Sequence, residues 1–568
     1  MSNPIFSLLA ESFKYAKGHR KMMIFYLALS AIANIVILFE PYVFGQMLVT
    51  LQNGGDPQVL MKKATSYIAI LVALPIIFWI FHGTSRYFER KVAFFVMGFY
   101  QQSALQALFS LPMEWHRKHH SGKNIDKIRR AGMALLNFAS DIFVLVEIFV
   151  TLFGAFILLF FVKFYAGLIA FLVTFLAFTV VILFDRILFK QYKNLNSAYG
   201  KTASAVHDYV SNVFTVLTMR FERSAIKEYL RRYFAPFPLY RKNVILNEFK
   251  WASVTVTVMV MTIFVIAYEI RSELLTDGVV SLGILYTLFA YMDRVGSRFY
   301  EFAWKYSQTV EQNASLKSAE NIFNDYGKFG FKSSAKPPKN WKKIEIRNLH
   351  FTYLDEKRTK HQIENISLDI PRGARIAFVG ESGCGKSTVL GLLRGIYKAS
   401  KASVFADGKK LHHGLAHLAP ITTLMPQEPE VFNNTIRYNV TMGVQIPADR
   451  IKKALDSARF SSVLKKLPDS LDTDIAEKGI NLSGGEKQRL ALARGLIAAE
   501  SSDILLMDEP TSSVDMKNER AIFENIFKET PDKTIIASVH RLSLLPLFDT
   551  VCHFEEGKLI KCDTKAAN

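Results

Sequence analysis

Two glycine-rich stretches in this chain each have the composition of a phosphate-binding site. The first, GESGCGKST, follows the apolar run RIAFV and precedes the helical pattern TVLGLLRGIY. In that context glycines let backbone N–H groups surround phosphate oxygens, lysine reaches the terminal phosphates, and a serine hydroxyl can ligate Mg²⁺. The residues expected to bind the nucleotide here are Gly380, Glu381, Ser382, Gly383, Cys384, Gly385, Lys386, Ser387 and Thr388.

A pair of acidic residues ends a second apolar run, ILLMDEP. Asp508 at the end of a buried strand would lie beside a nucleotide-bound metal ion, and Glu509 follows where it could polarise an attacking water. Two acids in an ordinary turn would explain neither the apolar strand nor the phosphate loop. We therefore predict nucleotide hydrolysis, with Ser387 and Asp508 as Mg²⁺ ligands and Glu509 as the base.

The second glycine-rich stretch, NLSGGEKQRLALARG, places Ser483, Gly484 and Gly485 at the start of a predicted helix. Backbone amides at a helix N-terminus, unobstructed by side chains, also favour phosphate. One nucleotide does not require two such loops, so the second loop needs an explanation of its own.

Length and composition limit the fold that positions these residues. A chain of 568 residues is too long for one hydrophobic core, so two or more domains are expected. Six apolar stretches each lie near the ~20 residues that span a bilayer, and buried helices of a soluble protein would rarely give six. They are residues 23–39, 67–82, 142–162, 165–184, 251–268 and a last stretch from Val279.

The net charge of +20 could suggest nucleic-acid binding, but its position argues otherwise. Residues 1–340 carry 37 Lys and Arg against 21 Asp and Glu, a net of +16, whereas 341–568 carry 33 against 29, a net of +4. The excess is concentrated in 83–141 and 185–250, between apolar stretches. The positive-inside rule then puts the N-terminus, both long loops and the C-terminal domain in the cytoplasm, and no nucleic-acid partner is expected.

The termini and cysteines add smaller constraints. The N-terminal segment resembles a signal peptide, but its apolar run reaches the length of a span, so an uncleaved helix is expected. No peptidase domain precedes the first span, so transport coupled to cleavage of a substrate's leader peptide is not expected. The three cysteines all lie in the C-terminal part and suggest no disulfide framework, as suits a reducing cytosol.

The domain organisation follows from a change of pattern. We predict six membrane helices, extended into the cytoplasm by two long helical loops, over residues 1–325, then a polar linker over 326–342. From 343 to 568 the pattern is that of an α/β nucleotide-hydrolysing domain. There KKIEIRNLHFTY and ENISLDI alternate like antiparallel strands, and RIAFV and DILLM are like central parallel strands.

These motifs resemble the ATP-binding cassette (ABC) transporters, specifically exporters with a fused membrane domain. LSGGEKQ resembles the signature motif of that family, and the resemblance covers nearly the whole chain. It implies that Tyr353 stacks on adenine, that Gln427 senses Mg²⁺ and the membrane domain, and that His540 contacts the γ-phosphate. Asp515 lies in SSVD, which is similar to the loop linking two active sites, although Ser513 stands where the family often has alanine.

The resemblance also explains the second glycine loop. In this family two nucleotide domains pack head to tail, so Ser483, Gly484 and Gly485 would bind the ATP of a second subunit. One chain would then be half of a working unit, a homodimer or a heterodimer. It implies ATP and Mg²⁺ as cofactors, an inner or plasma membrane location, and coupling turns near Met113–His120 and Asn212–Leu217.

Substrate residues are less clearly indicated. Glu147 lies within the third apolar stretch, and Asp293, Arg294 and Arg298 lie along the sixth, where Arg294, Arg298, Glu301 and Lys305 form one helical stripe. These residues either line a cavity that binds an anionic amphiphile, such as a lipid head group, or pair with one another and with neighbouring helices. Two histidine clusters are assigned structural or surface roles rather than metal binding: Glu114, His116, His119 and His120, and His412, His413 and His417.

The expected function is therefore ATP-driven export or flipping of an amphiphilic lipid, peptide or drug. An ATP-gated channel or a regulatory membrane protein built on the same cassette is the alternative. The complete set of Glu509, Ser483 and His540 favours a transporter that turns over ATP, because gating can persist with a damaged site.

Overall fold

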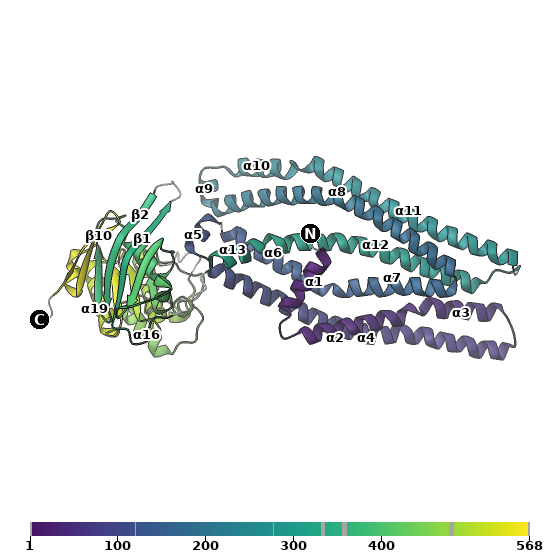
Figure 1. The fold of residues 1–568 in the computed structure, drawn as a ribbon, viewed down its shortest axis with the longest axis horizontal. Helices are drawn as coiled ribbons and strands as arrows, with labels where there is room; N and C mark the ends of the chain where they lie inside the picture. The colour runs from purple at the N-terminus through teal and green to yellow at the C-terminus, as the bar shows by residue number, and fades with distance from the viewer. Residues whose placement is uncertain are drawn as a thin grey trace. The chain divides into compact units, whose positions relative to one another are not determined.

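The computed structural model describes residues 3–119, 121–276, 278–330, 336–354, 360–475 and 482–565, without the side chains of 353, 354, 360 and 361. The chain divides into two compact units: Met1–Phe109 with Ser121–Asn324, and Ser110–His120 with Asp325–Asn568. Figure 1 shows that the first unit is helical and that the strands belong to the second.

Long helices make up the first unit because apolar runs without breakers continue into charged helical segments. Asp56 begins the longest of them by accepting a hydrogen bond from Gln58 N–H (3.1 Å). The helices are α1 (Pro4–Tyr15), α2 (Arg20–Leu38), α3 (Glu40–Gln52), α4 (Pro57–Phe109), α6 (Ser121–Ser140), α7 (Ile142–Val162), α8 (Phe164–Ser211), α9 (Val213–Thr218), α10 (Glu222–Phe234), α11 (Phe237–Thr276) and α12 (Leu282–Ser318).

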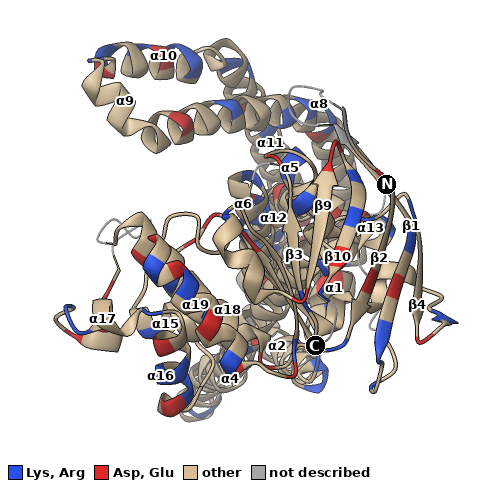
Figure 2. Cartoon of the chain, turned by 90° about the vertical axis from the view of Figure 1, so that its left-hand side faces the viewer, with Lys and Arg blue, Asp and Glu red and all other residues tan. Residues whose placement is uncertain are grey.

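Five helical stretches in the described part of the chain are long and apolar enough to cross a membrane. They correspond to the first five predicted spans. The sixth predicted span forms the long helix α12, but its charged residues from Asp293 onward keep it outside that set. Cytoplasmic extensions were also predicted, and charged residues recur along α10 beyond the apolar segments (Figure 2).

Breaks between helices are stabilised by buried ionic groups. Where α6 ends and α7 begins, Arg86 donates to the carbonyl of Ser140 (2.7 Å), and Glu89 accepts from Phe143 N–H (2.8 Å). Lys305 of α12, which is 1% exposed, contacts Asp141 between the two helices (2.5 Å). Free backbone groups at a buried helix end need such partners, so these side chains fix the junction.

The second unit contains two sheets. The smaller is antiparallel, with strand order β2-β1-β4-β5, and the larger has the order β10-β9-β3-β8-β7-β6, with β10 antiparallel at its edge and the rest parallel. The strands are β1 (Lys343–Leu354), β2 (Lys360–Pro371), β3 (Arg375–Val379), β4 (Lys401–Ala406), β5 (Lys409–Lys410), β6 (Thr422–Met425), β7 (Ile504–Asp508), β8 (Thr534–Ser538), β9 (Thr550–Glu555) and β10 (Lys558–Thr564). The predicted antiparallel pair is β1 with β2, and RIAFV and DILLM are the central parallel strands β3 and β7.

Helices pack on the larger sheet and cover its apolar residues. The helices of this unit are α5 (Met113–Lys118), α13 (Glu320–Phe329), α14 (Lys386–Arg394), α15 (Ile436–Thr441), α16 (Ala448–Ser457), α17 (Ser461–Leu464), α18 (Gly484–Ala499) and α19 (Met516–Glu529); α13 begins in the first unit. The parallel strands β7 and β8 are buried throughout, which is why they read as continuous apolar runs.

One disulfide was not expected from the cysteine count. Cys552 and Cys562 face each other across β9 and β10 and are bonded, with their Cα atoms 4.1 Å apart. Strand register brings them together, and register is not visible in the number or spacing of cysteines. Cys384 is a buried free thiol.

Candidate nucleotide site

The phosphate loop lies between β3 and α14 in a backbone conformation that requires glycine. Gly380, Gly383 and Gly385 have φ of 146°, 85° and 102°. A Cβ at Gly380 would lie 2.2 Å from the carbonyl oxygen of Phe554, and one at Gly385 would lie 2.5 Å from Ile363. The loop therefore packs closely against the end of the sheet, and the N-terminus of α14 points into the loop.

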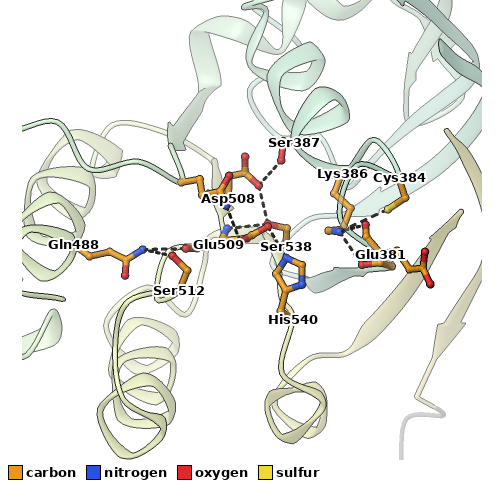
Figure 3. A network of polar contacts seen from close by, with 12 residues as sticks. Glu381, Cys384, Lys386, Ser387, Gln488, Asp508, Glu509, Ser512, Ser538 and His540 are labelled. Carbon is orange, nitrogen blue, oxygen red and sulfur yellow. Dashed lines mark hydrogen bonds and ion pairs between the residues drawn. The ribbon is translucent and has the colours of Figure 1, made fainter. Parts of the chain in front are cut away.

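Lys386, the first residue of α14, is folded into this loop. Its Nζ donates to the carbonyl oxygens of Gly380 (2.8 Å) and Glu381 (2.9 Å) and lies 3.6 Å from Sγ of Cys384. The side chain is 4% exposed. Ser382 is exposed and Thr388 is half-buried on the first turn of α14. The ammonium is thus held at the loop that was predicted to surround phosphates (Figure 3).

Asp508 at the end of β7 joins the loop to the neighbouring strand. Its Oδ1 accepts hydrogen bonds from Ser387 Oγ (2.9 Å) and from Ser538 Oγ (2.8 Å). Burial raises the pKa of Asp508 above its ordinary value, and the two hydroxyl donors oppose that shift. The predicted metal ligands Ser387 and Asp508 are therefore adjacent.

Glu509 is surrounded by two of the other predicted catalytic residues. His540 Nε2 lies 2.5 Å from Glu509 Oε1, and Gln427 Nε2 donates to Oε2 (2.8 Å). The backbone of Glu509 is left-handed, with φ of 44°, which costs a non-glycine residue about 1 kcal/mol or more. Its N–H donates to Ser538 Oγ (2.8 Å). The orientation of the carboxylate is therefore fixed by its hydrogen-bond partners, because the backbone of the turn itself is strained.

The second glycine loop forms a helix start, as predicted. Ser483 caps α18 in a reciprocal capping box with Glu486, whose carboxylate accepts from both the N–H and the hydroxyl of Ser483 (2.8 Å each). Those hydrogen bonds, the backbone N–H bond first, lower the pKa of Glu486. Among the residues that the structure describes, no hydrogen bond or ion pair joins Ser483, Gly484 or Gly485 to the phosphate loop.

Asp515 begins the helix α19. Its carboxylate accepts from the N–H (3.0 Å) and the side-chain amide (2.6 Å) of Asn518, and these bonds lower its pKa. Tyr353 belongs to β1, but its side chain lies outside the described part of the chain.

Two residues of this network were missed in the sequence. Ser538 ends the apolar run TIIAS on β8, between β3 and β7, so the rule that found Asp508 would have found it. Gln488 follows Ser483 on α18 and donates to the carbonyl of Glu509 (3.2 Å). Its target is a backbone atom, and no side-chain motif marks such a contact.

Comparison with known families assigns both units. Residues 363–512 match the family described as ABC transporter, and residues 23–295 match the ABC transporter transmembrane region. The chain belongs to the ABC transporter family. Most of α2, the helices α3 to α11 and the start of α12 fall within the transmembrane match, so this ABC transporter chain is an integral membrane protein.

Relatives of this ABC transporter chain carry several names. It is 31% identical over 304 residues to ABC transporter B family member 24, mitochondrial, of Arabidopsis thaliana (52% of this chain, 44% of the relative). It is 34% identical over 224 residues to the ATP-dependent lipid A-core flippase of Photobacterium profundum (39% and 38%). It is 35% identical over 227 residues to ABC multidrug transporter MDR1 of Cryptococcus neoformans (39% and 16%). The matched segments thus span less than half of each of these relatives.

The fold has a solved counterpart over nearly its full length. A bacterial Atm1-family ABC exporter with ATP bound superposes with a TM-score of 0.80, covering 96% of each chain at 20% identity. At that identity the likeness establishes the fold alone.

Of the charged residues predicted to be substrate candidates, Glu147, Arg294 and Arg298 form ion pairs. Arg298 contacts Glu147 (2.7 Å) and Glu301 (2.5 Å). Arg294 contacts Glu40 (2.8 Å) and the carbonyl oxygens of Ile37 and Leu38 (3.0 and 3.3 Å). Asp293 is exposed on α12. Pairing with neighbouring helices, one of the two interpretations of this stripe, is therefore observed.

Described histidines of the two clusters make contacts with aromatic rings and backbone atoms. No set of three or more His, Cys, Asp or Glu suited to a metal occurs among the residues that were described, which leave out His120. His119 instead stacks on Trp115 at 4.1 Å, and His413 lies 5.4 Å from His417, ring centre to ring centre. Near the first cluster, α5 donates Trp115 Nε1–H to Asp325 (2.8 Å) and Met113 N–H to the carbonyl of Ile396 (3.4 Å).

Proposed function

We propose that this chain is one subunit of a dimeric ABC exporter or flippase, which uses ATP hydrolysis to move an amphiphilic substrate across a membrane. The observation that carries the proposal is the position of Glu509: its carboxylate lies between His540 and Gln427, next to the Ser387–Asp508 pair. A complete hydrolytic site attached to membrane helices favours turnover over simple gating. Its relatives named as a flippase and a multidrug transporter support the same class.

The residues divide the hydrolytic work among themselves. The Gly380–Thr388 loop and Lys386 would bind the phosphates of ATP. The oxygens of Ser387 and Asp508 lie 2.9 Å apart, which fits adjacent ligands of an octahedral Mg²⁺ with bonds of about 2.0–2.1 Å. The ion, when bound, would neutralise phosphate charge. Glu509 would accept the proton of the attacking water, with His540 and Gln427 orienting its two oxygens.

A second copy would complete the site. Ser483, Gly484 and Gly485 form a helix start suited to phosphate, yet they have no contact with the chain's own phosphate loop among the described residues. A phosphate site of this kind is best explained by the ATP of another subunit. The exposed apolar residues of α9, such as Phe214 at 78% exposure, offer that subunit a further contact.

The substrate is proposed to be an anionic amphiphile that competes for the α12 stripe. The side chain of Arg298 is 28% exposed, so part of it is accessible although it is paired with Glu147 and Glu301. A lipid head group would have to replace these carboxylates. The cassette and the N-terminus are proposed to face the cytoplasm of an inner or plasma membrane, because loops rich in Lys and Arg are expected on the cytoplasmic side.

The test is ATP hydrolysis by the full chain in proteoliposomes, measured with a panel of lipids, peptides and drugs. We expect Mg²⁺-dependent hydrolysis that at least one amphiphile stimulates, together with ATP-dependent transbilayer movement of that amphiphile. Glu509→Gln protein serves as the control and should do neither. Hydrolysis without any transbilayer movement, or ion conductance that needs ATP binding but not Glu509, would overturn the proposal in favour of a channel.

A further inference from the structure

Gln488 uses its side-chain amide, as donor and as acceptor, to bind Glu509 and the two residues Ser512 and Ser513 that follow it. Nε2 donates to the carbonyl of Glu509 (3.2 Å) and to Ser512 Oγ (3.0 Å), and Oε1 accepts from Ser513 N–H (2.8 Å). Figure 3 shows Gln488 and Ser512 beside Glu509. The Gln488 side chain is 3% exposed, and a buried amide satisfied in this way has a fixed orientation.

The contact matters because Glu509 has a strained backbone. A left-handed residue other than glycine persists only where its surroundings determine the conformation. For Glu509 the N–H is bound by Ser538, and the carbonyl accepts from Gln488 (3.2 Å) and from the backbone N–H of Ser512 (3.2 Å). Gln488 also binds the hydroxyl of Ser512, so it holds both the carbonyl and the residue that shares it. Loss of the Gln488 amide would leave the Glu509 carbonyl with the Ser512 N–H alone and would weaken the restraint on the strained peptide.

Gln488 also belongs to the helix that carries the second glycine loop. It lies little more than one turn after Ser483, and a Cβ at Gly485 would lie 2.8 Å from the carbonyl oxygen of Ser513. The first turn of α18 therefore packs directly on the main chain that Gln488 binds. Movement of this helix start and movement of the segment after Glu509 are mechanically linked.

We propose that Gln488 is a positioning residue for hydrolysis. It holds the left-handed backbone of Glu509, so the orientation of the Glu509 carboxylate depends on the position of α18. The inference deepens the proposed function and rests on it. Gln488 itself touches neither Lys386 nor the Ser387–Asp508 pair among the contacts that the structure describes. Its loss should therefore affect the chemical step more than nucleotide binding.

The first variant is Gln488→Met, which keeps the length of the side chain and removes its hydrogen bonds. We expect kcat for ATP to fall about tenfold or more while the Kd for ATP changes less than about twofold. Leu492→Met, one turn later on the same helix and 2% exposed, is the matched control for altered packing. It should change neither quantity by more than about twofold.

The deciding experiment repeats Gln488→Met in the Glu509→Gln background and measures single-turnover hydrolysis. If Gln488 acts through Glu509, the single-turnover rate of the double variant should be less than about twofold below that of Glu509→Gln alone. Both substitutions would then act on the same carboxylate, so their effects would not add. Equal losses in both backgrounds would overturn the proposal and make Gln488 a stabilising residue only. So would unchanged kcat in the single variant.

Failure of the proposed function would look different. Wild-type protein without Mg²⁺-dependent ATPase activity would remove the basis of both proposals. If the wild-type protein hydrolyses ATP but the effects of Gln488→Met and Glu509→Gln on the single-turnover rate are additive, the transporter proposal stands and only the role of Gln488 is removed.

Discussion

His540 Nε2 and Glu509 Oε1 lie 2.5 Å apart, and Gln427 binds the other carboxylate oxygen of Glu509. The three residues come from separate segments: the end of β7, the turn after β8, and the segment after β6. Because β6, β7 and β8 are parallel neighbours, all three residues lie at the carboxyl ends of these strands. A carboxylate held by two side chains at these strand ends is positioned to act on a water.

Replacement of the carboxylate tests that assignment. Glu509→Gln should retain ATP binding and lose about 10²–10⁴-fold in turnover, since a general base contributes that much. Equilibrium nucleotide binding and steady-state hydrolysis are to be measured on the same preparation, and persistent ATP-bound dimers should accumulate. Hydrolysis near the wild-type rate would assign the base to another residue.

Lys386 should show the opposite pattern. Its ammonium now binds two loop carbonyls and would turn to phosphate oxygens when ATP is present. Lys386→Ala should weaken ATP binding roughly ten- to hundredfold, because hydrogen bonds to charged groups contribute about 1.5–3 kcal/mol. Lys398→Ala, at an exposed position beyond α14, is the control. Unaltered affinity in Lys386→Ala would argue against a phosphate ligand.

The capping carboxylate of Glu486 predicts a pH dependence. Its pKa is lowered in the folded state, so its contribution to stability is present above the unfolded-state pKa of about 4.3 and is lost as pH falls through the folded value. Wild type should therefore unfold at a higher temperature than Glu486→Gln at pH 7, and the difference should shrink below pH ~4. Asp532→Asn, at an exposed turn, is the control. A difference that does not vary with pH would exclude this role.

The ion pairs of Arg298 with Glu147 and Glu301, here called the Arg298 triad, predict opposite effects of two substitutions. Arg298→Ala should abolish stimulation of ATPase activity by anionic lipid and spare basal activity. Glu147→Gln frees Arg298 from one carboxylate and should increase the stimulation. ATPase activity in vesicles with and without anionic lipid measures both. Equal stimulation of both variants and wild type, with equal dimer stability, would make the triad structural only.

The sequence predicted which residues of the candidate nucleotide site lie close together, because they belong to local strand-and-turn motifs. A glycine loop between β3 and α14 and an acid at the end of β7 follow from strand-and-turn patterns, and parallel strands must bring such ends together. Ser538 follows from the same rule, because it is the polar residue that ends the apolar run of β8 beside β7. Gln488 could not be found in this way, since two of its three partners are main-chain atoms in and after the strained residue Glu509.

Features that depend on strand register or on the packing of neighbouring helices could not be predicted from the sequence. The Cys552–Cys562 bond depends on which residues of β9 and β10 face each other. The stripe on α12 was visible by its spacing, but only the packing of α3 and α7 against α12 identifies Glu40 and Glu147 as its partners. A pattern along one helix predicts a face and does not identify what covers it.

The most direct measurement for the shared-site account is ATP hydrolysis by mixed dimers. Lys386→Ala damages the phosphate loop and Ser483→Arg damages the signature loop, so each homodimer has two faulty sites. Mixing the two subunits should give some dimers with one doubly damaged site and one intact site, and hydrolysis should exceed that of either variant alone. No gain on mixing, with heterodimers present by co-purification, or full activity in a purified wild-type monomer, would contradict the account.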